Sequence, residues 1–469
     1  MINRRGFLKG SFAGLGVASG LATNFSTFNA FAADASDYKA LVCVFLNGGM
    51  DGHDTLIPTD VDSSNRYESL RSQMLASYDG RPDGFSRRRR NDLRSLNDAD
   101  IDGRTFGFPE ELRPLQELFN LGQMSVVGNV GPLIEPLNRV QLNNGSRRVP
   151  ARLGSHNDSS STWVASQPEG ATAGWGGRFS DIMQAANANT NASFSSVSAA
   201  GRQIFLTGEQ TNGFEVSTVG GLSVDHLDSS NFLGSSTFAS NYENILRDAQ
   251  RNNNSPDLSA FGRDMGDILR TSLVSNELLT EQLAIGGDLS TSFPSSSLGQ
   301  QLQIIARIIS RRQGLGVGRQ IFFVQQGGYD THRNQPNNLP ELQQDLGNSL
   351  RAFYDATVEL GVASNVTSFT ASDFGRALQP SRNGTDHGWG NHHMVVGGAV
   401  NGGQILGDVP PPILGHDYDQ GRGRLIPQVS VDQYAGALGR WYGLTQGEVR
   451  DALPGIVNFD ENALNGLFS

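Results

Sequence analysis

Short apolar runs alternate with longer amphipathic segments along most of the chain. Residues 41–46 (LVCVFL) are apolar without interruption, which is typical of a strand buried on both faces of a parallel sheet. Residues 339–360 instead repeat apolar side chains at helical spacing. This alternation predicts an α/β fold in which helices cover both faces of a mostly parallel central sheet. The predicted strands are residues 41–46, 124–130, 204–207, 319–325, 366–370 and 394–398, and the predicted helices are residues 110–121, 175–185, 302–313 and 339–360.

Three segments lack this alternation. Residues 59–104 are polar and are predicted to form a surface insertion with one or two helices, in which arginines 87–90 belong to a solvated loop. Residues 132–170 are irregular and rich in Gly, Pro, Ser and Asn. Residues 208–300 are rich in Ser and Asn, with helical stretches near 240–250 and 259–285, and are predicted to cap one edge of the sheet. We therefore expect a single α/β domain over residues 34–469, with insertions near 59–104 and 208–300.

The N-terminal segment (1–33) has the features of an export signal. Arg4 and Arg5 lie in a stretch that resembles the twin-arginine export motif, a weakly apolar stretch (10–22) follows, and residues 30–32 (AFA) form a small-x-small cleavage site. No cysteine directly follows the apolar stretch, so we expect no lipid anchor. The pattern predicts that the twin-arginine export machinery carries the folded protein to a periplasmic or secreted location.

Composition and charge narrow the range of partners. The formal net charge of −11 argues against a nucleic-acid partner, because binding to phosphates needs a basic surface. No apolar run reaches the roughly 18 residues that a membrane-spanning helix needs, so we expect no integral membrane segment in the mature protein. The one cysteine, Cys43, lies inside the first predicted strand and is interpreted as a buried small residue rather than as a nucleophile.

Acidic residues follow three of the predicted strands. Asp51, Asp330 and Asp373 each come shortly after the carboxyl end of a strand, and ligands bind at that edge of open α/β sheets. Each aspartate could instead cap the helix that follows it. Histidines concentrate in the same loops and in the glycine-rich segments beside them. These histidines are His53, His156, His332, His387, His392 and His393.

Carboxylates and imidazoles that meet at one edge of a sheet make a mixed set of oxygen and nitrogen ligands. Such a set suits one or two divalent metal ions, namely Zn²⁺, Mn²⁺ or iron, and carboxylate-rich subsites also accept Mg²⁺ or Ca²⁺. Two ions can hold both the attacking and the leaving oxygen of an ester displacement. In the alternative interpretation, the histidines only bond backbone groups.

Several of these segments resemble the DUF1501 family of bacterial proteins, and the resemblance covers nearly all of the mature chain. The matching segments are LVCVFLNGGMDGHDTLIP (41–58), GSHNDSSSTW (154–163), GWGGR (174–178), GGYDTH (327–332), SDFGR (372–376) and GTDHGWGNHH (384–393). That family in turn resembles the alkaline phosphatase/sulfatase superfamily. The resemblance implies an alkaline phosphatase-like α/β fold with a helical and loop cap, and one or two metals at the carboxyl edge of the sheet.

The resemblance also implies a set of metal ligands. Asp51 matches the first-strand acidic ligand of the superfamily. Asp330 and His332 resemble its Asp–His ligand pair, although one residue lies between them where the superfamily has three. His387 resembles the late histidine ligand.

One position departs from the pattern of the superfamily. Asp373 matches the aspartate of a further Asp–His pair, but Phe374 stands in the place of the histidine. This departure weakens one metal subsite unless His392 or His393 substitutes for the missing ligand. A site for one metal and a site for two metals therefore both remain open.

The nucleophile of the superfamily is a hydroxyl or a modified cysteine at a helix N-terminus, where the helix dipole and the metal favour the alkoxide. Here the catalytic candidates are Ser155 and the adjacent His156, before a helix-like stretch that ends at Trp163. Ser155 could equally be an ordinary helix cap. A modified cysteine is not expected, because Cys43 lies within a strand. The other candidate hydroxyls belong to Thr55, Ser159, Ser160, Ser161 and Thr162.

These features predict an exported, metal-dependent hydrolase of phosphate or sulfate esters that acts on an anionic ester substrate. Arg178 or Arg376 could pair with that substrate bidentately, or could form a structural salt bridge. The alternative is a non-catalytic binding protein of the cell surface or periplasm on a degenerate hydrolase fold, which Phe374 and the short spacing from Asp330 to His332 favour. A transferase or mutase is a third possibility, but export argues against it because phosphorylated metabolites are mostly cytoplasmic.

Overall fold

The central strand β1 (Lys39–Leu46) shows how the sequence builds the core in the computed structural model of the chain. Successive side chains alternate between the two faces of the sheet. Val42 and Val44 belong to one hydrophobic cluster, whereas Cys43 and Phe45 belong to another on the opposite face, and all four are buried. Because no polar side chain interrupts the strand after its first residue, it lies in the middle of a sheet that is covered on both faces.

The central sheet is mostly parallel. In spatial order it contains β11 (Ile405–Gly407), β5 (Met124–Gly131), β10 (Asn391–Gly397), β9 (Val366–Ser372), β1, β8 (Arg319–Gln326), β6 (Ser196–Ser198) and β7 (Phe214–Glu215), and β12 (Val429–Ser430) pairs with β5. β10 runs antiparallel to β9 and β5, whereas β1 pairs in parallel with both β8 and β9. The prediction of an α/β fold around a mostly parallel sheet is therefore confirmed.

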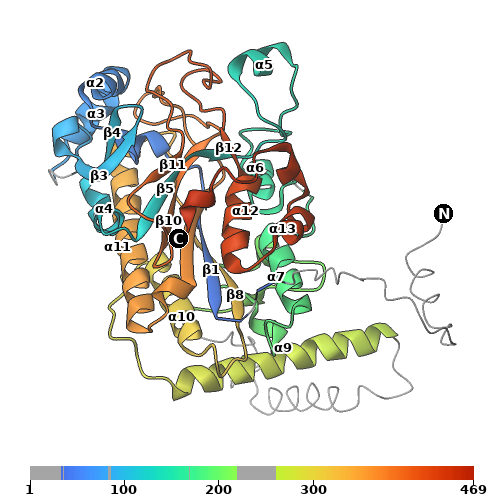
Figure 1. Cartoon of the computed structure of the whole chain (residues 1–469). Coiled ribbons are helices and arrows are strands. Elements are labelled where there is room, and N and C mark those ends of the chain that lie inside the picture. Colours follow the sequence, from blue (N-terminus) through green and yellow to red (C-terminus); the bar gives the residue numbers. More distant parts are fainter. Residues whose placement is uncertain (1–32, 35, 83–85, 168–169, 219–259) are drawn as a thin grey trace, which may run out of the picture. The chain divides into compact units, whose positions relative to one another are not determined.

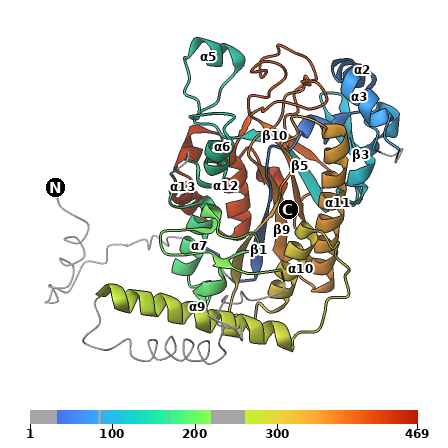
Figure 2. The same ribbon diagram turned by 180° about the vertical axis from the view of Figure 1, so that it is seen from behind.

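Helices form a layer on each face of this sheet, as Figures 1 and 2 show from opposite sides. One face packs against α4 (Arg113–Asn120), α9 (Ala260–Ile285), α10 (Ser297–Ser310) and α11 (Gln335–Glu359). The other face packs against α6 (His156–Ala165), α7 (Trp175–Ala185), α12 (Val431–Tyr442) and α13 (Gln446–Ala452). The short helix α5 (Arg139–Asn144) lies beyond both layers in a loop.

Residues 59–104 contain more than the predicted surface insertion. The two helices α2 (Val61–Leu70) and α3 (Ser72–Asp79) confirm the helical part of that prediction. A second, antiparallel sheet adjoins them, with the order β2 (Ile57–Pro58), β4 (Arg104–Phe108) and β3 (Arg94–Ile101). This small sheet joins the main core, because Leu96 and Phe106 pack in the same hydrophobic cluster as Val42.

The prediction that arginines 87–90 form a solvated loop is wrong for Arg88. Its side chain is fully buried, with Nη1 at 3.1 Å from Oε2 of Glu111 and Nη2 donating to Oε1 of Gln343 at 2.8 Å. A buried guanidinium is tolerated here because its partners are an opposite charge and an amide oxygen. Both partners lie far along the chain from Arg88, so the local run of arginines could not reveal them.

Two other predicted elements differ from the structure. Residues 204–207 form a short 3-10 helix, η5 (Ile204–Leu206), rather than a strand. The strand β10 begins at Asn391 rather than at residue 394, so it contains His392 and His393. The remaining predicted strands and helices agree with the structure to within a few residues, and α9 matches the stretch predicted at 259–285.

The structure describes residues 33–34, 36–82, 86–167, 170–218 and 260–469. Nearly all of the predicted export signal and the helical stretch predicted near 240–250 lie outside these residues. Among the described residues, every helix is too short or too polar to cross a membrane.

Candidate metal centre

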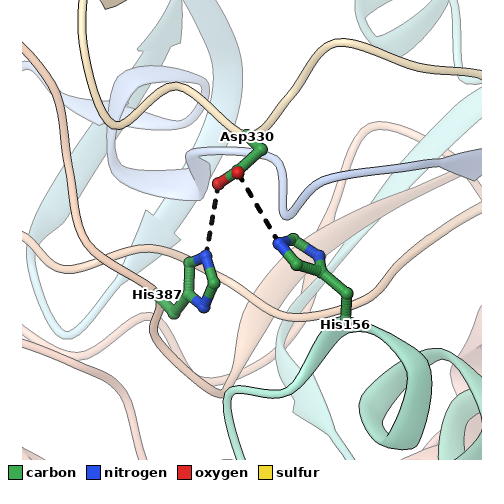
Figure 3. A group of neighbouring side chains, drawn as sticks. All are labelled: His156, Asp330 and His387. Carbon is green, nitrogen blue, oxygen red and sulfur yellow. Dashed lines mark hydrogen bonds and ion pairs between the residues drawn. The ribbon is translucent and has the colours of Figure 1, made fainter.

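Loops and one helix N-terminus bring acidic and imidazole side chains together at the carboxyl edge of the sheet. Asp330 follows β8, Asp373 directly follows β9, and His387 lies in the loop that leads into β10. His156 is the first residue of α6. Figure 3 shows His156 and His387 pointing toward Asp330 from two sides. His332 lies beside them, and we call the group of His156, Asp330, His332, Asp373 and His387 the histidine cluster.

The spacing of three of these side chains fits a shared cation. Ligand atoms of His156, Asp330 and His387 all lie within 4.8 Å of one another. Nε2 of His387 is 3.2 Å from Oδ1 of Asp330, and Nε2 of His156 is 3.7 Å from Oδ2. Two ligands of a tetrahedral Zn²⁺ at about 2.1 Å from the metal stand roughly 3.4 Å apart. The two separations from Asp330 are therefore close to those that one bound cation requires.

The imidazole of His387 is held so that Nε2 presents a lone pair. Its Nδ1 lies 2.8 Å from the backbone oxygen of Gly154, which can only accept a hydrogen bond, so Nδ1 carries the proton. Burial lowers the pKa of His387, and the nearby cation Arg376 acts in the same direction, so the ring is neutral at pH 7. The lone pair of Nε2 faces the carboxylate of Asp330, and a cation between the two would stabilise this arrangement.

A carboxylate orients His156 in the same way. Nδ1 of His156 lies 2.5 Å from Oδ2 of Asp373, so Nδ1 donates to that oxygen and Nε2 is left free on the side of Asp330. The same Oδ2 accepts from the backbone N–H of Gly48 at 3.2 Å. Oδ1 of Asp373 is buried and has no hydrogen-bond partner among the described residues. Because buried carboxylate oxygens rarely stay unpaired, this oxygen is a further potential ligand at the site.

His332 adds a third imidazole on the solvent side. Its Nε2 lies 2.8 Å from Nε2 of His387 and 3.1 Å from Oδ1 of Asp330. Two imidazole nitrogens at this distance need a proton or a cation between them. The side chain of His332 is 44% exposed, so it meets water while it contacts Asp330 and His387.

Phe374 packs against both anchored imidazoles. Its ring centroid lies 4.4 Å from that of His387 and 4.8 Å from that of His156, and its side chain is buried. The position at which the superfamily resemblance implies a histidine ligand is therefore filled by an aromatic side chain that restrains two other histidines. No pattern in the sequence signalled this packing role.

Arg376 neutralises Asp330. Its Nη2 and Nη1 donate to Oδ1 of Asp330 at 2.8 and 3.1 Å, and Nη1 also donates to the backbone oxygen of Gly48 at 3.0 Å. The side chain is fully buried. Of the two interpretations of Arg376, the structure contains the salt bridge.

Asp51 does not join the histidine cluster. Both of its oxygens accept from Arg71, at 2.8 and 3.2 Å, and Oδ2 also accepts from Nε2 of Gln335 at 2.7 Å. The side chains of Asp51 and Arg71 are fully buried. The structure thus gives Asp51 a guanidinium as its counter-ion, where the sequence predicted a metal. We call this group the buried ion cluster, and its members are Asp51, Asp54, Tyr67, Arg71, Tyr78 and Gln335.

His392 also lies apart from the histidine cluster. It is buried within β10, and its Nδ1 accepts from the backbone N–H of Asn129 at 3.1 Å. Burial lowers the pKa of His392 to about 3. His393 points to the opposite face of the strand and packs against Trp163. Because both histidines belong to the strand and not to the preceding loop, neither stands in for the ligand that Phe374 replaces.

Ser155 lies between Gly154 and His156 in the chain, next to the histidine cluster. The backbone oxygen of Gly154 is bonded by His387, and His156 follows in the chain. Oγ of Ser155 donates to Oδ2 of Asp158 at 2.9 Å and makes no capping bond to the backbone of α6. The position is an N-cap, but the hydroxyl does not act as one, so it remains a candidate nucleophile.

Most of the other candidate side chains are buried or hydrogen-bonded to backbone oxygens. Thr55 is buried and donates to the backbone oxygen of Asp51, and Thr162 donates to that of Asp158. Ser159 and Ser161 are buried within α6. The guanidinium of Arg178 donates to three backbone oxygens, those of Ala165, Ala173 and Ala452.

The chain matches the model of a protein family. The family model described as "Protein of unknown function (DUF1501)" matches residues 38–446 of the chain. No curated protein matches the chain significantly. The matched range includes every member of both clusters.

Proposed function

The chain belongs to the DUF1501 family, and we propose that it is an exported hydrolase of phosphate or sulfate esters that depends on a divalent cation. The cation would be held at the carboxyl edge of an alkaline phosphatase-like sheet. The family description assigns no function, so the proposal depends on the geometry of the histidine cluster.

One observation carries this proposal. His156 and His387 each donate through Nδ1 to a fixed acceptor, Asp373 or the backbone of Gly154, while both Nε2 atoms lie near the carboxylate of Asp330. Histidines that bind metals are oriented in this way, because the bond at one ring nitrogen aims the lone pair of the other. Without a cation, the buried Oδ1 of Asp373 has no partner among the described residues, a costly arrangement that a bound cation would relieve.

The donor set favours a particular kind of cation. Two imidazole nitrogens with carboxylate oxygens suit Zn²⁺ or Mn²⁺ better than Mg²⁺ or Ca²⁺, which prefer oxygen ligands throughout. One cation is proposed rather than two, because the guanidinium of Arg71 already neutralises Asp51. A divalent cation bound by the histidine cluster would polarise an oxygen of the ester and would acidify water.

Residues of the chain supply the other requirements of hydrolysis. His332 is exposed enough to exchange protons with water and touches the cation ligands, so we assign it the transfer of a proton to the departing alcohol. Two nucleophiles are compatible with the site, a water molecule and the hydroxyl of Ser155. Asp158, which accepts a hydrogen bond from that hydroxyl, would favour its deprotonation.

The test is an assay of the mature protein across aryl phosphate, phosphodiester and aryl sulfate substrates. Each assay is run after removal of metal and again after addition of Zn²⁺, Mn²⁺, Mg²⁺ or Ca²⁺. We expect cation-dependent turnover that His387→Ala abolishes and that His416→Ala leaves intact. His416 is a suitable control because it is a partly buried histidine that bonds the backbone of Tyr418. Absence of turnover in fully metal-loaded protein would refute the proposal.

The same protein samples distinguish the two candidate nucleophiles, Ser155 and water. If Ser155 attacks, Ser155→Ala removes activity without removing the cation, and the wild-type protein forms a phosphoryl or sulfuryl ester on that serine. If water attacks, Ser155→Ala keeps most of the activity. Electrospray mass spectrometry of the protein quenched during turnover distinguishes these outcomes.

A non-catalytic binding role is the second candidate. The guanidinium of Arg71 pairs with Asp51, and that of Arg376 pairs with Asp330. Part of the negative charge at the carboxyl edge of the sheet is therefore already neutralised by the protein itself. Full cation occupancy without hydrolysis of any ester in the panel would favour this role.

Export by the twin-arginine route is also a proposal, and it rests on residues 4–32 of the sequence. Replacing Arg4 and Arg5 by lysines keeps the charge of the segment but removes the paired guanidinium groups. We expect the full-length variant to accumulate inside the cells of a twin-arginine-competent bacterium, whereas the unaltered chain is processed and leaves the cytoplasm. Equal processing of both chains would show that another route is used.

A further inference from the structure

A cavity of about 740 Å³ lies at the opposite end of α6 from the histidine cluster. Its wall includes Thr162 and Ala165 in the last turns of α6, whereas His156 begins that helix. Ten helical residues span about 15 Å, so the cavity is separate from the proposed metal centre. Its volume lies within the range of small-molecule sites. We call it the Arg178 cavity, and its apolar wall is formed by Pro132, Leu133, Ile134, Val149, Pro150 and Pro454.

The GWGGR segment (174–178) explains how Arg178 reaches this cavity. The segment forms the first turn of α7, which packs closely on the chain after η5. A Cβ atom at Gly177 would lie 2.1 Å from the backbone carbon of Thr207, so glycine is required for this approach. The close packing fixes the first turn of α7 and thereby the position of Arg178.

Arg178 is a half-buried cation on which the opposite charges of Asp432 and Glu209 act only from a distance. Its Nε, Nη1 and Nη2 donate to the backbone oxygens of Ala452, Ala173 and Ala165 at 2.6, 3.1 and 3.3 Å. None of the described acidic side chains forms an ion pair with it within 4.0 Å. Each terminal nitrogen of a guanidinium carries a second N–H, so two donors remain. They can receive a carboxylate that enters the cavity.

Asp432 supplies the opposite charge in the same cavity. It is 6% exposed, and its Oδ1 accepts from Oγ of Ser166 at 2.7 Å, while Oδ2 makes no hydrogen bond to a described residue. Oδ2 lies beside Gly455, another residue of the cavity wall, and a Cβ atom there would come within 2.3 Å of it. Burial raises the pKa of Asp432, which reflects how incompletely this carboxylate is stabilised. An ammonium group of a ligand in the cavity could donate to this oxygen.

We propose that the Arg178 cavity binds a zwitterionic α-amino acid with a large apolar side chain. The carboxylate of the ligand would pair with Arg178 and its ammonium group with Asp432. The two charged side chains line one cavity but do not pair with each other, so a ligand with both charges satisfies both of them at once. The apolar wall receives the side chain of the ligand. Exposed Glu209 and Asp451 at the margin add negative potential, which favours the ammonium group over an anion alone.

The test is isothermal titration calorimetry of the mature protein with three probes that share one aromatic ring. These probes are L-phenylalanine, 3-phenylpropanoate, which lacks the ammonium group, and 2-phenylethylamine, which lacks the carboxylate. We expect saturable binding of L-phenylalanine and affinities at least about ten-fold weaker for each analogue, because each loses one charge-assisted bond. The comparison uses the unaltered chain and does not depend on hydrolysis at the histidine cluster.

Two variants locate the binding. Asp432→Asn keeps the size of the side chain and is expected to weaken L-phenylalanine about ten-fold, with little change for 3-phenylpropanoate. Asp451→Asn, at an exposed position of the same cavity, is the matched control and is expected to change affinity less than about two-fold. The proposal is overturned if L-phenylalanine gives no saturable heat, if either analogue binds as tightly as L-phenylalanine, or if folded Asp432→Asn binds all three probes like the wild type.

Discussion

The buried ion cluster and the histidine cluster lie at the same edge of the sheet, and both contain aspartates that follow buried strands. In the buried ion cluster, the guanidinium of Arg71, two phenols and an amide satisfy the carboxylates. In the histidine cluster, imidazole lone pairs face a carboxylate, and Oδ1 of Asp373 has no partner among the described residues. The residue at a strand end therefore does not by itself distinguish a metal ligand from a structural acid. The distinction lies in the hydrogen-bonding capacity that the neighbours leave unused.

A single amide side chain connects the two groups. Nε2 of Gln335 donates to Asp51 and Asp54, at 2.7 and 2.8 Å. Its Oε1 accepts from Thr331 and Thr385, at 2.9 and 2.7 Å. Thr331 lies between Asp330 and His332 in the chain. Through Gln335, the buried ion cluster therefore supports the loop that carries these two members of the histidine cluster.

Removing the cation of the buried ion cluster is expected to have the largest effect on stability. Arg71→Met leaves two buried carboxylates without their counter-ion, and breaking a buried pair in this way lowers the free energy of unfolding by about 3–5 kcal/mol. Urea denaturation of metal-free protein measures the change. Arg66→Met, at an exposed position of the helix α2 that precedes Arg71, is the control and should lie within about 0.5 kcal/mol of the wild type. A loss below about 1 kcal/mol for Arg71→Met would mean that the buried carboxylates do not depend on Arg71, and would restore Asp51 as a candidate metal ligand.

Adding a cation to the histidine cluster is expected to have the next largest effect, with the opposite sign. A ligand that binds only the folded state stabilises it by about 2.7 kcal/mol at one hundred times its dissociation constant. We expect this gain with Zn²⁺ or Mn²⁺ for the wild type, reversal by a chelator, and loss of the gain in His387→Ala.

A histidine outside both clusters provides the control for this test. His416→Ala should keep the full gain, since His416 lies outside both clusters. An equal gain in His387→Ala would place the cation elsewhere on the protein and would remove the histidine cluster from consideration as a metal centre.

The sequence predicts that Asp330 and Asp373 lie near each other because of one geometric rule. Asp330 and Asp373 follow strands that flank β1 in parallel, and parallel strands place their carboxyl ends at one edge. The same rule does not reveal the pairing of Asp51 with Arg71. Arg71 lies twenty positions further along the chain and reaches Asp51 only in the folded protein. Position after a strand predicts proximity to the edge, but it carries no information on charge pairing.

The fold likewise has features that the local sequence pattern predicts and features that it does not. The strands of the central sheet follow from continuous apolar runs such as residues 319–325. The burial of Arg88 against Glu111 and the start of β10 at Asn391 depend on contacts between distant segments. The orientation of His156 and the free oxygen of Asp373 likewise appear only once β9 and α6 are packed together.

The substitution Asp373→Asn is expected to weaken cation binding without unfolding the protein. An asparagine at this position keeps the size of the side chain but removes both the anionic partner of His156 and the unpaired carboxylate oxygen. Loss of such a supporting carboxylate typically lowers metal affinity about 10–100-fold. Competition with a chromophoric chelator measures the affinity.

A matched control for this substitution is Asp432→Asn, which alters another buried carboxylate away from the histidine cluster. It should leave cation affinity unchanged. If both substitutions lowered the affinity equally, the effect would be one of general charge rather than of ligand geometry.

Replacing Phe374 by leucine is expected to have the smallest effect, and it tests whether packing restrains the imidazoles. The ring of Phe374 contacts both His156 and His387, and such aromatic pairs contribute about 0.5–1.5 kcal/mol beyond burial. Cation affinity should therefore fall only a few-fold, because Asp373 and the backbone of Gly154 still orient the two rings. Phe45→Leu is the control, since Phe45 stacks on Phe323 in the core and should lower stability without changing cation affinity. An unchanged affinity in Phe374→Leu would assign the orientation of both histidines to their hydrogen bonds alone, and complete loss of binding would make the aromatic ring as important to the site as a ligand.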